Sequence, residues 1–336
     1  MVGYTARRVA WVVPILLGVA TLTFFVSRAM PGDPAKIFAG SQATDTAIAA
    51  IRAQFGFDKP LGVQYLDYLA GLARGDLGTS VRTGHGVLDD LMGRFPATIE
   101  LILAALTVAL VIGVPLGVAA GASARRGAER FARGVSTLGV SIPEFWLGLL
   151  LIVVFYSSLD IAPAPVGRLD IGVLAPDGVT GLITVDALLA GDLEVLGNAA
   201  GHLLLPALAL GLPAAAPIIR LSAEATASLL RSDHLFYTRA IGTPPHVVYL
   251  KHVLRNIAPI VTTMTALIFG FLVGGAVVVE EVFAWPGVGL YAIDSLHYND
   301  YAAVQGFVLL AAAVYILLFL AVDLVNTYLD PRKRLT

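Results

Sequence analysis

Six long apolar stretches dominate the pattern of hydrophobic and polar positions along the chain. They cover residues 9–30, 97–122, 134–159, 203–219, 258–279 and 302–328. Most of them reach the roughly 20 residues that a helix needs to cross about 30 Å of hydrocarbon. They lack the alternation of barrel strands, and lipid offers no partner to unpaired backbone, so the pattern predicts six transmembrane helices. The stretch 203–219 is the shortest and contains Pro206 and Pro213, which disfavour a helix interior.

Composition places the chain among integral membrane proteins. Hydrophobic residues make up 57% of the chain and charged residues 14%, and the mean hydropathy is +0.81. Soluble domains average about 45–50% apolar and about 25% charged residues. The expected fold is therefore all-α and polytopic, with the lipid bilayer as its solvent. The net charge of -2 gives no support to a nucleic-acid partner. The absence of cysteine excludes disulfides and thiolate metal ligands, and no metal site is expected.

Basic residues set the predicted orientation in the membrane. Most of the 22 Lys and Arg residues lie in segments that share a side with the N-terminus, whereas segment 160–202 carries several acids and one basic residue, Arg168. Because basic segments stay on the cytoplasmic side, both termini are expected in the cytoplasm. Arg7 and Arg8 precede the first apolar stretch, as in a signal peptide. A Pro-Gly-Asp-Pro turn follows it in place of a small-residue cleavage site, so it is interpreted as a retained anchor.

Two longer polar segments lie on the opposite, periplasmic side. Segment 31–96 has helical spacing of apolar residues over 46–55 and 61–72, and segment 160–202 has a short amphipathic piece near 185–189. Neither holds enough apolar residues for a core of its own. The predicted organisation is an N-terminal anchor helix over 1–30, a periplasmic segment with short helices over 31–96, and a core of five transmembrane helices over 97–336 with a periplasmic loop at 160–202 and a cytoplasmic loop at 231–256.

The cytoplasmic loop 231–256 is polar and basic, and it is predicted to form two short helices hinged at Gly242. The first helix would run over 233–241, with Ser232 or Asp233 as its cap. Gly242 supplies the left-handed residue that ends it. A charged helical pair between apolar stretches indicates a docking surface, although an ordinary solvated helical hairpin has the same spacing.

The second helix of this loop follows without a spacer. Thr243 is expected to cap it, and two prolines fit its first turn because N–H groups there lack partners in any case. Residues 246–256 continue the helix. Lys251, His252 and Arg255 make its last turns cationic.

The chain contains no catalytic or nucleotide-binding signature that would make it an enzyme. It has no G-x-x-x-x-G-K-[ST] phosphate loop and no H-E-x-x-H motif, and Gly139-Val140-Ser141 does not continue into G-x-S-x-G. No catalytic residue is therefore predicted. Any energy input must come from a partner or from an ion gradient.

Two acids within the apolar stretches bear on an ion-coupled carrier, because a charge in the bilayer is costly and commonly functional. Asp323, a membrane-embedded acid, lies in the last stretch with Asn326 one turn further on, and Glu144 lies near the start of the third. One acid per helix without a relay partner also fits a pair with a neighbouring helix or a wet interface.

Prolines and glycines interrupt the apolar stretches. Pro115 with Gly113 and Gly117 would kink or loosen the second stretch, whereas Gly274 and Gly275 permit close approach of helices. Ordinary packing accounts for each of them alone. Together they suit a bundle whose helices rearrange, as a transporter requires.

Seven short motifs carry a family resemblance that covers nearly the whole chain. They are Pro31-Gly32-Asp33-Pro34-Ala35, Arg74-Gly75-Asp76-Leu77-Gly78-Thr79-Ser80, Ser141-Ile142-Pro143-Glu144-Phe145-Trp146-Leu147-Gly148, His202-Leu203-Leu204-Leu205-Pro206-Ala207, Glu280-Glu281-Val282-Phe283-Ala284-Trp285-Pro286-Gly287-Val288-Gly289, Asp300-Tyr301 with Val304-Gln305-Gly306, and Asp330-Pro331-Arg332. With these motifs the chain resembles a permease subunit of the dipeptide and oligopeptide branch of bacterial ABC importers. The resemblance implies a six-helix, type I importer permease of the inner membrane that alternates access between periplasm and cytoplasm.

In such permeases a cytoplasmic coupling helix sits in a groove of an ATPase subunit, and the loop 231–256 resembles that element. The residues that the resemblance assigns to this contact are Phe236, Arg239, Ala240, Gly242, Thr243, His246, Lys251 and Arg255. Phe236 stands where many importers have an acid, Ile241 stands where this branch commonly has a basic residue, and Pro244-Pro245 is unusual. These departures predict a contact that is more apolar than is typical, with the hinge at Gly242 retained.

The resemblance also implies an assembly. The family works as two permease subunits, usually different, over two ATP-binding subunits that hold ATP and Mg. A periplasmic or lipid-anchored solute-binding protein delivers the substrate, and no cofactor is expected in this chain. The outer motifs make these residues candidates for contact with that binding protein: Asp33, Asp76, Glu281, Trp285 and Asp300.

The long loop 160–202 resembles that of dipeptide-type subunits, which favours short peptides as the substrate. Import of nickel, glutathione or another small solute stays open within the same architecture, because ligand choice rests largely with the binding protein. Outside it, the alternatives are an ion-coupled secondary carrier that depends on Asp323 and a membrane scaffold without transport activity. Uptake without any ATPase would indicate the carrier, and unchanged solute uptake after deletion would indicate the scaffold.

Overall fold

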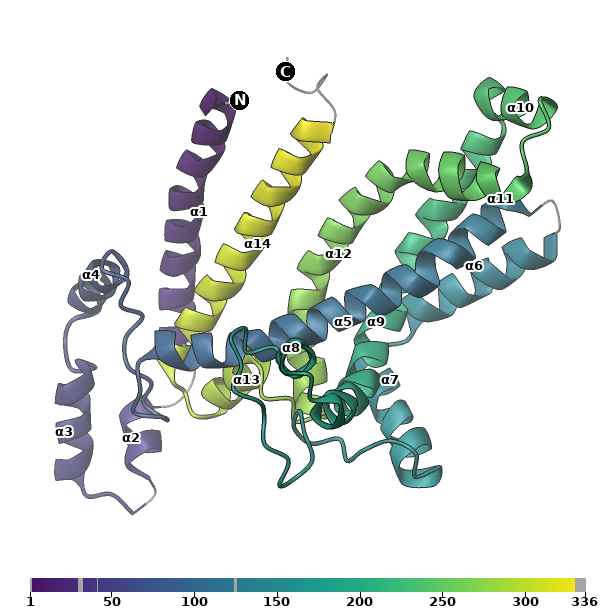
Figure 1. Cartoon of the computed structure of the whole chain (residues 1–336). Helices are drawn as coiled ribbons and strands as arrows, with labels where there is room; N and C mark the ends of the chain where they lie inside the picture. Colours follow the sequence, from purple (N-terminus) through teal and green to yellow (C-terminus); the bar gives the residue numbers. More distant parts are fainter. Residues whose placement is uncertain (1, 30–32, 41, 124–125, 330–336) are drawn as a thin grey trace. The chain divides into compact units, whose positions relative to one another are not determined.

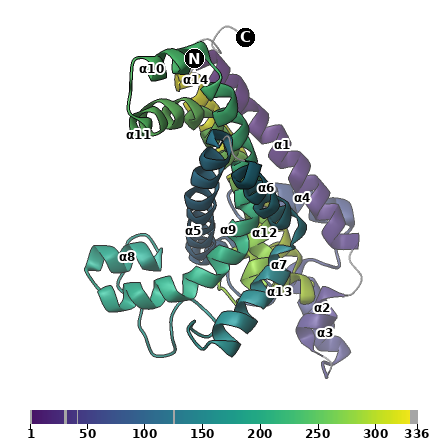
Figure 2. The same ribbon diagram turned by 90° about the vertical axis from the view of Figure 1, so that its right-hand side faces the viewer.

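The computed structural model describes the backbone of residues 2–29, 33–40, 42–123 and 126–329, and the side chains in these ranges except those of 2–10, 34, 37–38, 126, 128–129 and 322–329. The described residues form helices joined by turns (Figure 1). Among them, strand pairing is limited to one antiparallel bridge between Thr79 and Gly86. The predicted all-α fold is confirmed, and Figure 2 shows the same helices from the side.

The chain separates into two compact units. The first contains Met1–Ala97 and Pro286–Leu320, and the second contains Thr98–Trp285 and Ala321–Thr336. Helix α5 (Val87–Ala122) begins in the first unit and continues in the second. The first unit therefore joins segments from both ends of the sequence.

Five helical segments of the described chain are long and apolar enough to cross a membrane. They are Trp11–Ala29 within α1 (Val2–Ala29), α5, α9 (Leu193–Leu230), Pro245–Val282, and Tyr301–Ala321 within α14 (Tyr301–Leu329). Five of the six predicted apolar stretches thus correspond to such a helix.

The third predicted stretch, 134–159, is not one continuous helix. After α6 (Arg126–Ser141) the chain breaks at Pro143 and continues as α7 (Glu144–Leu151) and the π-helical η1 (Ile152–Ser158), and the two arms are bent by 101°. Proline has no N–H to continue the helix and disfavours the helical conformation in the residue before it. The expectation of an uninterrupted third span is wrong, and this pair can provide the sixth crossing only as a broken span.

The fourth predicted stretch, 203–219, is the middle of the longest described helix. Helix α9 spans 38 residues, and Asp192 caps it by accepting a hydrogen bond from Val195 N at 3.0 Å. The apolar window of α9 is 61% buried, against 22–33% for the other candidate spans. Packing against neighbouring helices stabilises α9 despite its three internal prolines. The prediction was too short because polar residues such as Glu194 and His202 gave its first turns the composition of a loop.

Two short helices of the first unit match the helical patterns within segment 31–96. Helix α3 (Asp45–Phe55) begins after Thr44, whose hydroxyl accepts a hydrogen bond from Ala47 N at 3.3 Å. It ends at a left-handed glycine with φ +68°. Helix α4 (Leu61–Leu72) follows, and both predicted helices are confirmed. The short helix α2 (Pro34–Ala39) was not predicted.

The core of the first unit brings together α5, α13 (Val288–His297) and α14. Its buried members are Val87, Leu91, Val288, Tyr291 and Ala303. On the same unit, Gln305 of α14 donates a hydrogen bond to the buried hydroxyl of Ser27 on α1 at 2.5 Å. A buried hydrogen bond therefore joins the first and last candidate spans.

Glycines let α5 approach α9 closely in the second unit. Gly113, Gly117 and Gly121 recur every four residues on one face of α5. A Cβ at Gly113 would lie 2.8 Å from Ile218 Cβ, and a Cβ at Gly121 would overlap the backbone oxygen of Ala223. Helix α5 is continuous across Pro115, and Gly113 and Gly117 are packing residues of its contact with α9.

Candidate functional site

The predicted cytoplasmic loop lies in the second unit and folds as a helical hairpin (Figure 1). Helix α10 (Asp233–Ala240) follows α9, and α11 (Pro245–Val247) begins a helix that continues through the π-helical η2 (Val248–Val253) into α12 (Leu254–Val282). Between α10 and α11, Gly242 has a φ of +80°. The left-handed turn expected from the sequence is therefore present.

The first helix of the hairpin has its N-cap at the predicted position, whereas the second does not. Ser232 is the N-cap residue of α10, but its hydroxyl donates to Leu229 O at 2.6 Å and makes no cap hydrogen bond. Pro244, and not Thr243, is the N-cap residue of α11, and it has no side-chain acceptor. The second helix also runs past Asn256, because the proline beyond it is tolerated inside α12. The predicted second short helix is therefore the start of a long span.

The inner face of the hairpin is a hydrophobic cluster. Its buried members are Leu235, Val248, Val253 and Ile257. Side chains of α5 and α9, including Val118 and Leu229, pack against this cluster. The rings of His234 and His252 also meet edge to face, with centroids 5.7 Å apart. Because packed interiors transmit displacement, a force on α10 is passed to the long helices of the second unit.

The outer face of the hairpin combines basic and apolar side chains. Phe236, Tyr237, Ile241 and Leu250 are 63–74% exposed. Thr243 is half-buried, and the other residues expected at the ATPase contact are exposed. These are Phe236, Arg239, Ala240, Gly242, His246, Lys251 and Arg255. We refer to the exposed residues of segment 231–256 as the hairpin surface, and its apolar members are of the kind that mark interaction sites.

Three of the residues expected to contact a binding protein are at least partly accessible. Asp33 pairs with Arg52 and accepts a hydrogen bond from Ala35 N at 3.0 Å. Burial by itself would raise the pKa of Asp33, but the hydrogen bonds and the charge of Arg52 outweigh it and lower that pKa. Asp76 is exposed and accepts a hydrogen bond from the backbone N–H two residues on at 2.8 Å, and Glu281 is exposed.

Asp300, the fourth expected contact residue, is fully buried in the first unit. Its carboxylate accepts hydrogen bonds from Ser80 Oγ at 2.6 Å, Arg82 N at 3.2 Å and Ala303 N at 3.3 Å. Asp300 therefore caps the start of α14 and holds the turn formed by residues 79–86 against this helix. It presents no surface to a partner in this conformation.

Trp285, the fifth expected contact residue, is also buried, and its ring lies 5.9 Å from the guanidinium of Arg168. Arg168 donates hydrogen bonds to the carboxylate of Glu100 and, at 3.0 Å, to Gly181 O. Glu100 also accepts from Thr184 N at 2.7 Å and Thr184 Oγ1 at 2.6 Å. This buried pair fastens the predicted periplasmic loop to α5. Sequence reasoning missed it, although Glu100 is the only charged residue of its apolar stretch and Arg168 is the only basic residue of segment 160–202.

Asp186 on α8 (Ile183–Ala190) organises the turn that precedes this helix. One carboxylate oxygen accepts from Thr180 N at 3.0 Å and Thr180 Oγ1 at 2.8 Å, and the other accepts from Gly181 N at 2.8 Å. Burial alone would raise the pKa of Asp186, but these hydrogen bonds outweigh it and lower the pKa. Asp186 therefore acts as a structural residue of the loop.

The two acids considered for ion coupling differ in what the structure describes. Asp323 lies on α14, and its side chain falls outside the described residues. Glu144 begins α7, and its carboxylate lies against Gly275 of α12, where no Cβ would fit. Within the part of the chain that the structure describes, no three His, Cys, Asp or Glu side chains are close enough to hold a metal ion.

Apolar helices of membrane-spanning length and a hairpin that continues into one of them define a polytopic membrane protein. The chain matches the family described as binding-protein-dependent transport system inner membrane component over residues 113–335. Residues 1–104 match the N-terminal membrane component of the same systems. The chain belongs to this family, and the ABC importer permease that its motifs predict is confirmed.

Relatives of established name are similar over almost their whole length. A probable D,D-dipeptide transport system permease protein, DdpB of Escherichia coli K12, is 42% identical over 97% of this chain and 96% of its own. The di/tripeptide permease protein DppB of Pseudomonas aeruginosa UCBPP-PA14 is 39% identical over 99% of both chains. The glutathione permease protein GsiC of Salmonella typhimurium LT2 is 34% identical over 99% of both.

Proposed function

We propose that the chain is the transmembrane permease subunit of an ATP-driven importer that passes dipeptides or short oligopeptides from a periplasmic binding protein to the cytoplasm. The observation that carries the proposal is the full-length similarity to a D,D-dipeptide and a di/tripeptide permease, at 42% and 39% identity. The bent third span and the tightly packed α5 and α9 supply helices that can tilt as rigid bodies.

The hairpin surface is the proposed contact with an ATPase subunit. Two ATP-binding partners would hold ATP and Mg, and their closure would push on α10 and on the start of α11. The buried cluster under the hairpin would pass this push to α9 and α12. The exposed Phe236 and Ile241 would make the contact partly apolar, with Arg239 and Arg255 adding charge.

The remaining partners follow from the same proposal. A second permease subunit, expected to be a different chain, completes the pathway. The chain lies in the inner membrane with both termini in the cytoplasm, as its basic segments favour. Asp33, Asp76 and Glu281 are the proposed contacts with the solute-binding protein, because their carboxylates reach the surface. Trp285 and Asp300 would support those contacts from the interior.

Reconstitution tests the proposal. The chain is purified with a second permease subunit and two ATP-binding subunits of the same transport system and is placed in liposomes with the binding protein of that system. Labelled dipeptide is expected to accumulate only when both ATP and binding protein are supplied. Uptake that continues without the ATPases and is lost in Asp323→Asn would replace the proposal with an ion-coupled carrier.

Glutathione is the second candidate substrate, because GsiC is 34% identical over 99% of this chain. Competition in the same liposomes separates the two. An excess of unlabelled dipeptide should suppress labelled uptake if peptides are the substrate. Suppression by glutathione, with dipeptides without effect, would favour the second candidate.

A further inference from the structure

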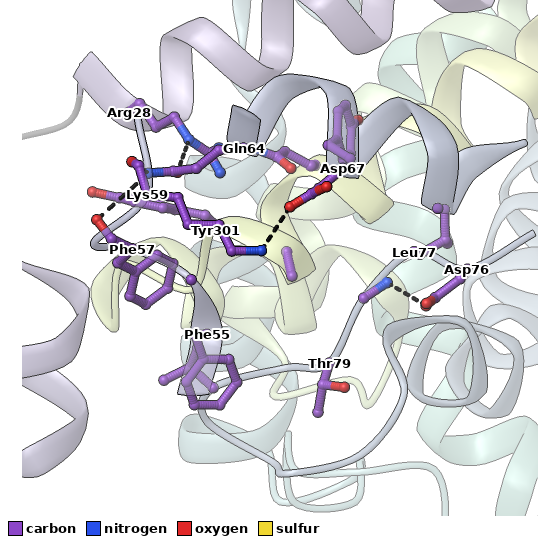
Figure 3. Close-up of a pocket in the computed structure, with 17 residues that line it drawn as sticks. Arg28, Phe55, Phe57, Lys59, Gln64, Asp67, Asp76, Leu77, Thr79 and Tyr301 are labelled. Atoms are coloured by element: carbon purple, nitrogen blue, oxygen red, sulfur yellow. Dashed lines mark hydrogen bonds and ion pairs between the residues drawn. The ribbon is translucent and has the colours of Figure 1, made fainter. Parts of the chain in front are cut away.

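A cavity in the first unit is lined by charged and aromatic side chains that the proposed coupling mechanism does not use. Its volume is about 230 Å³, and its walls come from the end of α1, the α3–α4 connection, α4, the turn after it and the start of α14. Figure 3 shows that Arg28 and Gln64 lie on one side of this cavity and Asp76 and Thr79 on another.

Two buried polar groups of this cavity have no hydrogen-bond partner among the residues that the structure describes. Arg28 donates through Nε to Gln64 Oε1 at 3.0 Å, whereas its buried Nη1 is unpaired. The buried hydroxyl of Tyr68 is also unpaired. Both side chains lie against Phe24, with Arg28 Cζ 3.6 Å and the Tyr68 ring 5.5 Å from its centroid. Buried polar groups are nearly always satisfied, so this pair indicates a site that a ligand completes.

The chemistry of these two groups defines the atom that would satisfy them. A guanidinium only donates hydrogen bonds. Burial raises the pKa of Tyr68 to about 12, against an opposing effect of Arg28, so its hydroxyl keeps its proton at neutral pH and can also donate. Two donors, one of them cationic, fit an anionic oxygen such as that of a carboxylate.

Two acids also line the cavity. Asp67 pairs with Lys59, their charged atoms being 2.8 Å apart, and both side chains are at least half exposed. Asp76 is exposed and accepts a hydrogen bond from the backbone N–H of Gly78. An exposed ion pair of this kind contributes little to stability, so Asp67 can exchange Lys59 for another cation. Asp76 lies across the cavity from Arg28 (Figure 3), so the cavity offers a cation and an acid to a ligand that carries a carboxylate and an ammonium.

We propose that this cavity binds a short peptide, with the peptide carboxylate on Arg28 and Tyr68 and the peptide ammonium toward Asp67 and Asp76. The choice of a peptide over other zwitterions rests on the proposed function. The cavity would be a binding site of the first unit, formed by residues other than those of the hairpin surface.

Calorimetric titration of the purified permease–ATPase complex, without binding protein or nucleotide, tests this site with the dipeptide alanyl-alanine as the probe. Tyr68→Phe removes one unpaired hydroxyl without altering a described contact, and it is expected to weaken binding roughly tenfold. Arg28→Gln should weaken binding by about tenfold to a hundredfold. Alanyl-alanine amide, which lacks the carboxylate, should bind the wild type as weakly as alanyl-alanine binds Arg28→Gln.

The matched control is Arg74→Gln, because Arg74 is an exposed arginine of the same segment that does not line the cavity. Equal affinity of alanyl-alanine for the wild type, Tyr68→Phe and Arg28→Gln would overturn the site. Native mass spectrometry gives a second test. If the wild type retains phosphatidylethanolamine, Arg28→Gln loses it and neither binds peptide, the peptide site would be overturned in favour of a lipid headgroup site. ATP-driven dipeptide uptake by the same complex reports on the proposed function separately, so uptake without cavity binding would remove only this inference.

Discussion

Replacing Gly242 tests whether the turn between α10 and α11 sets the hairpin surface. Its φ is +80°, and a Cβ built there would meet nothing within 4 Å. Gly242→Ala would therefore be disfavoured by backbone strain and not by a steric clash. That strain is about 1–2 kcal/mol, which shifts the equilibrium between the native turn and its alternatives roughly 5- to 30-fold. Asparagine tolerates the left-handed region better, whereas proline, with φ near -65°, cannot form this turn.

The assay is ATP-driven uptake into proteoliposomes that contain equal amounts of inserted permease. Gly242→Pro is expected to abolish uptake, Gly242→Ala to reduce it, and Gly242→Asn to stay near the wild type. Gly134→Ala is the matched control, because Gly134 also has open space around it but lies within helix α6. Normal uptake by Gly242→Pro, or an equal loss in Gly134→Ala, would refute the role assigned to this turn.

Three further predictions concern stability, measured as the thermal unfolding midpoint of the purified protein in detergent. The free energy of unfolding should fall by about 1–3 kcal/mol in Gly121→Ala, because the added methyl group overpacks against α9. Gly93→Ala on the same helix has open space around it and should cause no such loss. Equal effects of the two substitutions would contradict the packing argument. The free energy of unfolding should fall by about 3–5 kcal/mol in Arg168→Gln, because the buried carboxylate of Glu100 loses its counter-ion, and replacing both residues by glutamine should recover part of the loss. The pKa of Asp186 is lowered in the folded protein, so its contribution to the free energy of unfolding is present above about pH 4 and is lost as the pH falls through the folded pKa. Asp186→Asn should therefore reduce the loss of stability at acid pH. An unchanged loss would exclude Asp186 as its source.

Local features of the fold were predictable because they depend on neighbouring residues. The helix over 46–55 follows from apolar spacing, and the turn at Gly242 follows from a glycine between two helical patterns. The effect of a proline was not predictable in the same way. Pro143 breaks a helix, whereas Pro206 and Pro213 lie inside α9, so the presence of a proline does not by itself decide whether a helix ends.

The polar contacts that organise the two units could not be derived from local pattern. Glu100 and Arg168 pair across 68 positions of sequence, and Ser80 meets Asp300 across 220. Each residue alone also fits a solvated or interfacial charge, because spacing carries no information on contacts between distant segments. For the same reason Asp300 and Trp285 were expected at the surface, and the structure places both in the interior.

The continuity of the hairpin with its neighbouring helices bears on how the proposed coupling works. If α11 were a separate short helix, a push on the hairpin surface would be absorbed by the linker that follows it. Instead α11 continues into α12 without a break, and Leu235 of α10 is buried with Val248, Val253 and Ile257 of that same helix. A displacement of α10 must therefore move the start of α12 or open this cluster. Opening it exposes buried apolar side chains, and truncating one of them to alanine typically costs about 2–5 kcal/mol, so rigid movement of the hairpin with α12 is the less costly response.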